Sequence, residues 1–196
     1  MKSMLVVITF QAVVGLACAQ TIPSVDVQIK TAVLAAAEES REKAMVYGYS
    51  PKGEFIVVRK GENEFVCLAD DPTLPGLNVS CYHKSLEPFM ARGRQLKKEG
   101  KSSDDIFTIR EQEVKSGKLQ MNTQPATLVV YSASKENYNP ETGDVKDGYS
   151  RSVIYIPYAT AESTGLPAKP TTAGMPWIMN PGTHRAHIMI DPPKKN

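Results

Sequence analysis

The chain lacks a strong excess of either charge. It has 23 Lys and Arg against 21 Asp and Glu, which gives a formal net charge of +2 over 196 residues. Proteins that bind nucleic acid or anionic lipid usually carry a clear basic surplus. The balanced charge therefore predicts neither kind of partner.

Long apolar runs are missing after the first residues. The stretch 4–17 is mostly apolar and follows a positive charge, and Ala17 and Ala19 flank Cys18 as small residues. This order is typical of a secretory signal peptide, and the run is short for a transmembrane helix. We predict a signal peptide over residues 1–19 and no integral membrane segment after its cleavage.

Cysteine is scarce, with 3 in the whole chain. Cys18 would leave with the signal peptide, which leaves Cys67 and Cys81. An even pair in an exported protein predicts a disulfide, and the loop that it closes has a length for which chain entropy gives about 3 kcal/mol. Two alternatives stay open: a free catalytic thiol, and a lipoprotein anchored at Cys18, although Gly15 stands where a lipidation signal usually has a Leu-like residue.

Common enzyme signatures are also missing. The sequence has no P-loop, dinucleotide-binding fingerprint, H-E-x-x-H motif or G-x-S-x-G motif. Ser40 and Lys43, and again Ser132 and Lys135, match S-x-x-K, but no K-T-G accompanies them. Chance explains these matches, so the sequence alone leaves open whether the protein is an enzyme.

Helical and strand-like segments are grouped along the chain. A helix is expected after Ser24, and a pair of helices after Ser85 and after Ser102 or Ser103, because apolar residues recur there at spacings of three and four. Strand-like runs cover residues 45–50, 54–58, 64–69, 126–132, 152–158 and 185–190. The first three suggest an antiparallel meander, and residues 70–80 suggest a loop.

This grouping favours an α+β fold over a parallel sheet. We predict a single α+β domain over residues 20–196, in which an antiparallel sheet is packed by about three helices and held by one disulfide.

The segment 174–192 contains the only Trp and two of the three His residues. Trp177 follows a proline and suits either a stacking platform or a lid over the core. Arg185 and His187 share one face if residues 185–190 form a strand. His83 lies just before a predicted helix, where it suits either an anion site or a helix cap. We predict a ligand-binding face made of Trp177, Arg185, His187 and His83.

A metal site is the weaker interpretation of the histidines. His184 and His187 form H-x-x-H, and His83 could complete a three-histidine zinc site. On a strand, however, residues three apart face opposite sides. We therefore expect no metal and no cofactor, with His184 exposed and His187 hydrogen-bonded.

The segments CYHKSLEPFMARGR and PWIMNPGTHRAHIMI resemble a group of exported bacterial proteins of uncharacterised function. The resemblance extends through most of the chain after the signal peptide. It implies a periplasmic or secreted location and a single domain, and it assigns no activity and no site.

Together these observations predict an exported, non-catalytic binding or accessory protein of the cell envelope. Its partner would be a small molecule or an envelope protein. The alternative is a small hydrolase or metal-dependent enzyme centred on His187, with an acid such as Asp191 beside it.

Overall fold

The computed structural model describes residues 22–192. The predicted signal peptide, including Cys18, lies outside this range. Within it, no helix combines the length and the apolar character that crossing a membrane requires.

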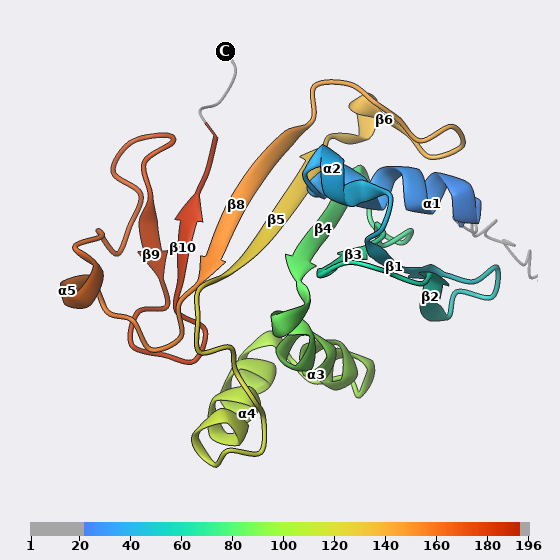
Figure 1. The fold of residues 1–196 in the computed structure, drawn as a ribbon. Helices are drawn as coiled ribbons and strands as arrows, with labels where there is room; N and C mark the ends of the chain where they lie inside the picture. Colours follow the sequence, from blue (N-terminus) through green and yellow to red (C-terminus); the bar gives the residue numbers. More distant parts are fainter. Residues whose placement is uncertain (1–21, 193–196) are drawn as a thin grey trace, which may run out of the picture.

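The described chain forms an α+β fold, as predicted (Figure 1). Its α-helices are α1 (Val25–Ala32), α2 (Glu38–Arg41), α3 (Glu87–Lys98), α4 (Ser103–Lys115) and α5 (Ala161–Thr164). The strands are β1 (Met45–Tyr49), β2 (Phe55–Arg59), β3 (Phe65–Leu68), β4 (Leu77–His83), β5 (Ala126–Ala133), β6 (Tyr138–Asn139), β7 (Asp144–Val145), β8 (Tyr149–Tyr155), β9 (Trp177–Met179) and β10 (His187–Ile190). Short 3-10 turns are η1 (Val33–Ala35), η2 (Lys84–Leu86) and η3 (Lys135–Asn137).

The main sheet is mixed, so the expectation of an antiparallel sheet is wrong in one place. Its eight strands run in the order β2-β1-β3-β4-β5-β8-β10-β9, and β1 pairs with β3 in parallel. After β2, the chain crosses the start of β1, where the amides of Glu62 and Asn63 donate to the Lys43 carbonyl over 2.8 and 3.3 Å. This crossing puts β3 on the free side of β1 instead of beside β2.

The expected loop 70–80 is correct only in its first part. From Leu77 the chain becomes β4, in which Leu77 and Val79 are buried while Asn78 between them is exposed. This is the alternation of a strand with one covered face. The proline and glycine residues just before β4 are typical of a loop, so the sequence indicated a loop for the whole segment.

The helix starts follow local capping chemistry. The Ser24 hydroxyl accepts from the Val27 amide at 3.3 Å, and Ser102 forms a capping box with Asp105 at the start of α4, as predicted. Before α3, the chain first forms η2, which the His83 side chain caps through the Ser85 amide. The prediction of about three helices fits the longer α1, α3 and α4 but misses α2 and α5, which have four residues each.

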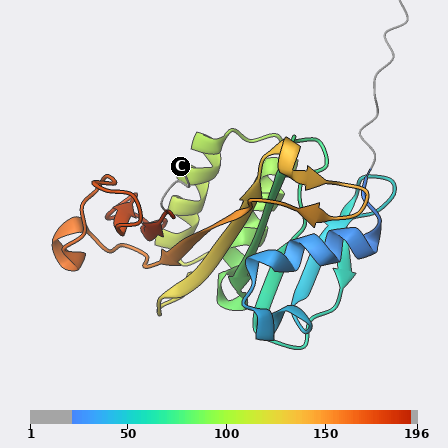
Figure 2. The same ribbon diagram turned by 90° about the horizontal axis from the view of Figure 1, so that it is seen from above.

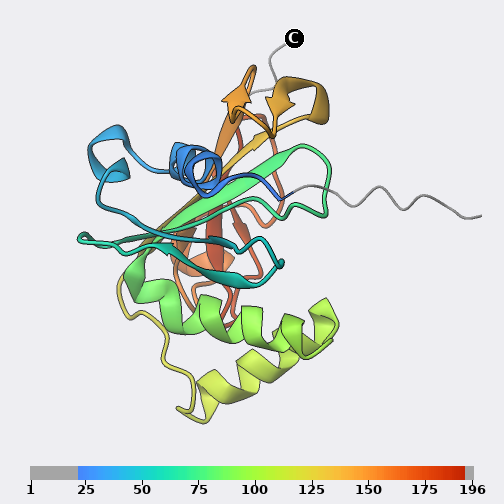
Figure 3. The same cartoon turned by 90° about the vertical axis from the view of Figure 1, so that its right-hand side faces the viewer.

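Helices cover both faces of the sheet (Figures 2 and 3). On one face, α1 and η1 pack on a core that includes Val46, Cys67 and Val79. On the other face, a second core includes Tyr82, Phe89 and Met189, with Phe89 contributed by α3. The sheet is therefore the shared layer of two cores.

The predicted disulfide between Cys67 and Cys81 is confirmed. The two cysteines lie directly opposite each other in β3 and β4, with their Cα atoms 4.0 Å apart. The bond closes the loop that connects these strands, and this loop forms one wall of a cavity.

Candidate functional site

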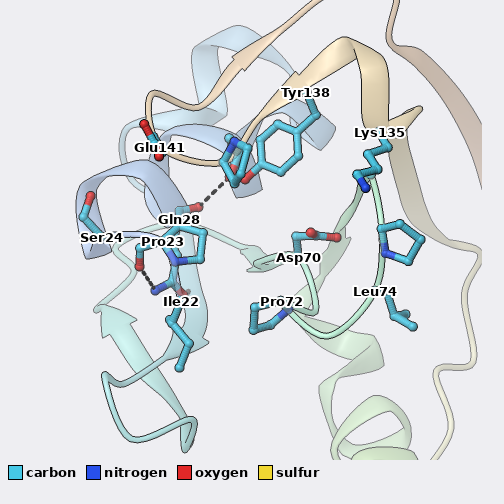
Figure 4. Close-up of a pocket in the computed structure, with 14 residues that line it drawn as sticks. Ile22, Pro23, Ser24, Gln28, Asp70, Pro72, Leu74, Lys135, Tyr138 and Glu141 are labelled. Carbon is cyan, nitrogen blue, oxygen red and sulfur yellow. Dashed lines mark hydrogen bonds between the residues drawn. The ribbon is translucent and has the colours of Figure 1, made fainter. Parts of the chain in front are cut away.

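A cavity of about 650 Å³ lies where three segments that are distant in the sequence meet (Figure 4). The first segment comprises α1 and the residues just before it, the second connects β3 to β4, and the third runs from η3 through β6 into the turn before β7. The residues that line the cavity are Ile22, Pro23, Ser24, Gln28, Thr31, Asp70, Pro72, Leu74, Pro75, Gly76, Lys135, Tyr138, Pro140 and Glu141. Its walls thus combine apolar and proline side chains with a few polar groups, as ligand sites usually do.

Gln28 fixes the α1 wall to the sheet. Its side chain is buried. The side-chain nitrogen donates to the main-chain carbonyls of Pro23 at 2.8 Å and Tyr49 at 2.9 Å. The side-chain oxygen accepts from the Tyr49 amide at 2.6 Å. Gly48 leaves room for this contact, because a Cβ there would lie 2.5 Å from the Gln28 oxygen. The wall is therefore positioned by a complete set of hydrogen bonds.

The third segment is fixed to α1 by charge. Lys30 donates to a carboxylate oxygen of Asp144 at 2.9 Å and to the Thr142 carbonyl at 3.0 Å. Residues 138–145 form the small β6–β7 hairpin. This hairpin brings Tyr138 to the cavity wall (Figure 4).

The second wall depends on Gly76. Its φ is +84°, and a Cβ there would lie 2.7 Å from the Ala133 carbonyl oxygen. Glycine tolerates both conditions, whereas any other residue meets strain or a clash. Gly76 therefore lets the loop that carries Asp70 turn directly into β4.

Asp70 is one of the charged residues that line the cavity, together with Lys135 and Glu141 (Figure 4). One of its carboxylate oxygens accepts from the Asn78 amide at 2.7 Å. Burial raises the pKa of Asp70 to about 6, although this hydrogen bond acts in the opposite sense. Among residues 22–192, no Lys, Arg or His forms an ion pair with it, and this includes Lys135 of the cavity wall. The cavity thus contains a carboxylate without a cationic partner.

The role of Asp70 could not be recognised in the sequence. Asp70 stands in a run of turn-forming residues, where a carboxylate is ordinary. Its environment depends on α1 and on the β6–β7 hairpin, both of which are far away in the chain. A pair of acidic residues at a strand end, followed by a proline, was the only available signal.

Three of the four residues of the predicted ligand face lie near one another on the other side of the sheet. Trp177 begins β9 opposite Met189 of β10, and His187 lies two residues before Met189, so their side chains share a face. Arg185 precedes β10 and its main-chain oxygen accepts from His187 Nδ1 at 2.6 Å. The strand β9, which Trp177 begins, is a short strand at the edge of the sheet.

His83 is not part of that group. Successive pairings across the sheet join Met189, Val153, Leu128 and Tyr82 on one face. His83 follows Tyr82 directly, so it points to the opposite face. There it caps η2 and contacts Ser85, with a ring nitrogen to hydroxyl distance of 2.8 Å.

His187 is a core residue in its surroundings. It is 4% exposed, and its ring stacks on Tyr155 with centroids 5.2 Å apart. Burial lowers the pKa of His187, with a further contribution from the charge of Arg185. Asp191, the acid considered for a hydrolase, instead pairs with Arg151 and accepts from Trp177 Nε1 at 3.3 Å.

His184 is buried, so the expectation that it is exposed is wrong. Its side chain is fully enclosed and contacts Phe107 and Phe89, with ring centroids 4.9 and 5.5 Å away. Both its Nδ1 and its main-chain amide bind the Glu111 carboxylate. The cause is a loop that folds under α4, which local strand alternation could not reveal.

Glu111 is correspondingly stabilised as a carboxylate. Burial raises its pKa, but hydrogen bonds from Lys115 and His184 outweigh that effect and lower the pKa to about 2. Within the described part of the chain, no group of His, Cys, Asp and Glu residues is arranged to hold a metal ion.

A second cavity of about 610 Å³ lies between residues 121–125 and 156–159. None of the residues lining it is charged. It therefore offers less specific chemistry than the cavity beside Asp70.

No family model, curated protein or solved structure matches this chain, so a function can be inferred only from the chain's own geometry.

Proposed function

We propose that the protein is a non-catalytic binding protein of the cell envelope, and that its cavity beside Asp70 holds a small molecule with a cationic group. One observation carries this proposal: a cavity of about 650 Å³ encloses a carboxylate that lacks a cationic partner among the described residues. Ligand cavities commonly measure roughly 300–1,000 Å³.

The electrostatics favour a cationic ligand. A carboxylate taken partly out of water is destabilised unless a positive group or hydrogen-bond donors compensate. Only main-chain hydrogen-bond donors stabilise the charged form of Asp70, and its raised pKa shows that this stabilisation does not offset the cost of burial. An ammonium group beside Asp70 would stabilise the carboxylate further.

The other lining residues suit a ligand with an apolar body. Pro72 and Leu74 contribute apolar surface from the loop, and the Tyr138 ring lies on another wall (Figure 4). An aromatic ring next to a carboxylate is a common environment for ammonium groups, because the ring face attracts cations. The proposed ligand class is therefore a small primary amine with an apolar or sugar-like frame.

An enzyme centred on His187 has less support. Such an enzyme needs a carboxylate or a metal ion at the imidazole. The described contacts of His187 are the Arg185 carbonyl and the Tyr155 ring, and Asp191 is occupied by other partners. We therefore assign binding to the cavity beside Asp70 and leave His187 out of the proposed site.

A thermal-shift screen with matched ligands tests the proposal. The probes are 1,5-diaminopentane, glucosamine and phenethylamine, each beside its fully N-acetylated counterpart, which for the diamine is the N,N′-diacetyl form. At least one amine should raise the melting temperature of the wild-type protein, while its acetylated form should not, since acetylation removes the charge.

Two variants provide the control. Asp70→Asn should abolish the amine effect, whereas Asp71→Asn should keep it, because Asp71 bonds Thr73 and does not line the cavity. The proposal would be wrong if none of the amines acts, or if the amine effect survives in Asp70→Asn.

A further inference from the structure

The cavity beside Asp70 is lined by charges of both signs. Asp70 and Glu141 are its acidic residues, and Lys135 is its basic residue. Among residues 22–192, no carboxylate forms an ion pair with Lys135, and this includes Glu136, its neighbour in the chain. The cavity therefore contains a cation and an anion that are not paired with each other.

Asp70 and Lys135 both approach the start of β4. Asp70 accepts a hydrogen bond from the amide of Asn78, the second residue of that strand. The main-chain nitrogen of Lys135 lies 3.3 Å from the place that a Cβ on Gly76, just before the strand, would take. Figure 4 shows the Lys135 side chain extending toward the region where Asp70 lies. A molecule bound in the cavity can therefore contact both groups.

Glu141 lies in a different part of the cavity. In Figure 4 its side chain stands near Ser24, at the start of α1, and the Tyr138 ring lies between it and Lys135. Glu141 is thus at the end of the cavity away from Lys135. It leaves the Lys135 end open to a negatively charged group.

The two facing charges differ in how firmly they are held. The Asp70 carboxylate is fixed by its hydrogen bond to the Asn78 amide. Lys135 is exposed, and its ammonium group is a compact charge on a flexible stem. One fixed acid and one adjustable base suit a ligand that carries an ammonium and a carboxylate a short distance apart.

We infer that the ligand of this cavity is an amino acid, whose ammonium group binds Asp70 and whose carboxylate binds Lys135. This inference rests on the proposed function and names the ligand class more closely. A simple amine pairs with Asp70 alone, whereas an amino acid pairs with both protein charges. Pro72 and Leu74 then offer apolar surface to the rest of the ligand.

Pairs of ligands that differ by one carboxylate test this inference. The pairs are 1,5-diaminopentane with L-lysine, phenethylamine with L-phenylalanine, and butylamine with 5-aminopentanoate, in which the two charges lie further apart. Each ligand is titrated into the full mature protein by calorimetry at constant ionic strength. In at least one pair the amino acid should bind about fivefold more tightly than the amine, which is the gain from one partly exposed ion pair.

Three variants assign the preference to single residues. Lys135→Gln should remove the preference for the amino acid without weakening the amine, because only the carboxylate contacts Lys135. Lys146→Gln is the matched control and should keep the preference, since Lys146 is exposed and does not line the cavity. Asp70→Asn should weaken both members of the pair.

Equal affinities within every pair would overturn the inference, and so would a preference that survives in Lys135→Gln. Either result leaves the amine site of the proposed function intact, provided that Asp70→Asn still weakens the amine. Failure of the proposed function is distinguishable, because then neither the amines nor the amino acids bind, and the inference fails with it.

Discussion

At the scale of single residues, Asp70 carries an energetic cost that a ligand can relieve. Its pKa in the folded protein is raised to about 6 from 3.8, mainly by burial. Between these two pH values the folded protein holds more protons at Asp70 than the unfolded chain does. The contribution of this group to stability therefore falls as the pH rises from about 4 to about 6.

Replacing Asp70 with Asn should stabilise the protein without ligand. Near pH 7.5 the free energy of unfolding should rise by about 1 kcal/mol, a modest value because solvent reaches part of the carboxyl group and screens its charge. Near pH 4 the gain should vanish, since the wild-type carboxyl is then largely protonated in the folded state. Urea denaturation of both proteins at the two pH values measures this difference, and a stability loss at pH 7.5 would mean that Asp70 has a stabilising partner.

At the scale of elements, the disulfide holds the loop that forms one wall of the cavity. Cys67 and Cys81 are separated by 14 residues in the sequence, and the loop between them carries Asp70 and Gly76. Closing a loop of this length stabilises a protein by about 3 kcal/mol in the chain-entropy model. The same bond limits the movement of the loop relative to the rest of the cavity.

Removing the disulfide should therefore affect both stability and ligand binding. The double variant Cys67→Ala, Cys81→Ala should lose about 3 kcal/mol in urea denaturation and should bind an amine ligand more weakly than the wild-type protein. Alkylation of the unreduced mature protein should label neither cysteine. Labelling would contradict the disulfide, and unchanged ligand affinity in the double variant would show that the loop does not need it.

The helix starts, the position of β3 and the cavity differ in how far they could be predicted from the sequence. Ser24 and Ser102 mark helix starts through hydrogen bonds to residues three positions away, so local patterns were sufficient there. The position of β3 depends on which side of β1 it pairs with, and the strand propensity of the residues does not determine that side. The cavity could not be predicted because its walls come from residues 22–31, 70–76 and 135–141, and their meeting is a property of the whole sheet.

At the scale of the whole molecule, one sheet connects the two cores. Trp177 lies on β9 at one edge of the sheet, while the disulfide and the cavity beside Asp70 lie toward the opposite half (Figure 1). Since continuous strand pairing links these regions, we expect them to unfold together as the predicted single domain.

Two probes test this cooperativity. Trp177 is the only tryptophan, so its fluorescence reports on the β9 edge, whereas far-ultraviolet circular dichroism reports on all helices and strands. The two urea transitions should have the same midpoint. Separate midpoints would indicate two folding units and would contradict the single-domain prediction.

The most direct test of the central claim is native mass spectrometry of the protein produced in its own host. Spectra of the wild-type protein, Asp70→Asn and Asp71→Asn are compared with spectra of the same samples after denaturation. We predict that the wild-type protein and Asp71→Asn carry an additional small mass that denaturation removes, and that Asp70→Asn lacks it. A wild-type mass equal to that of the bare chain, or the same additional mass on Asp70→Asn, would contradict the assignment of the cavity beside Asp70 as the ligand site.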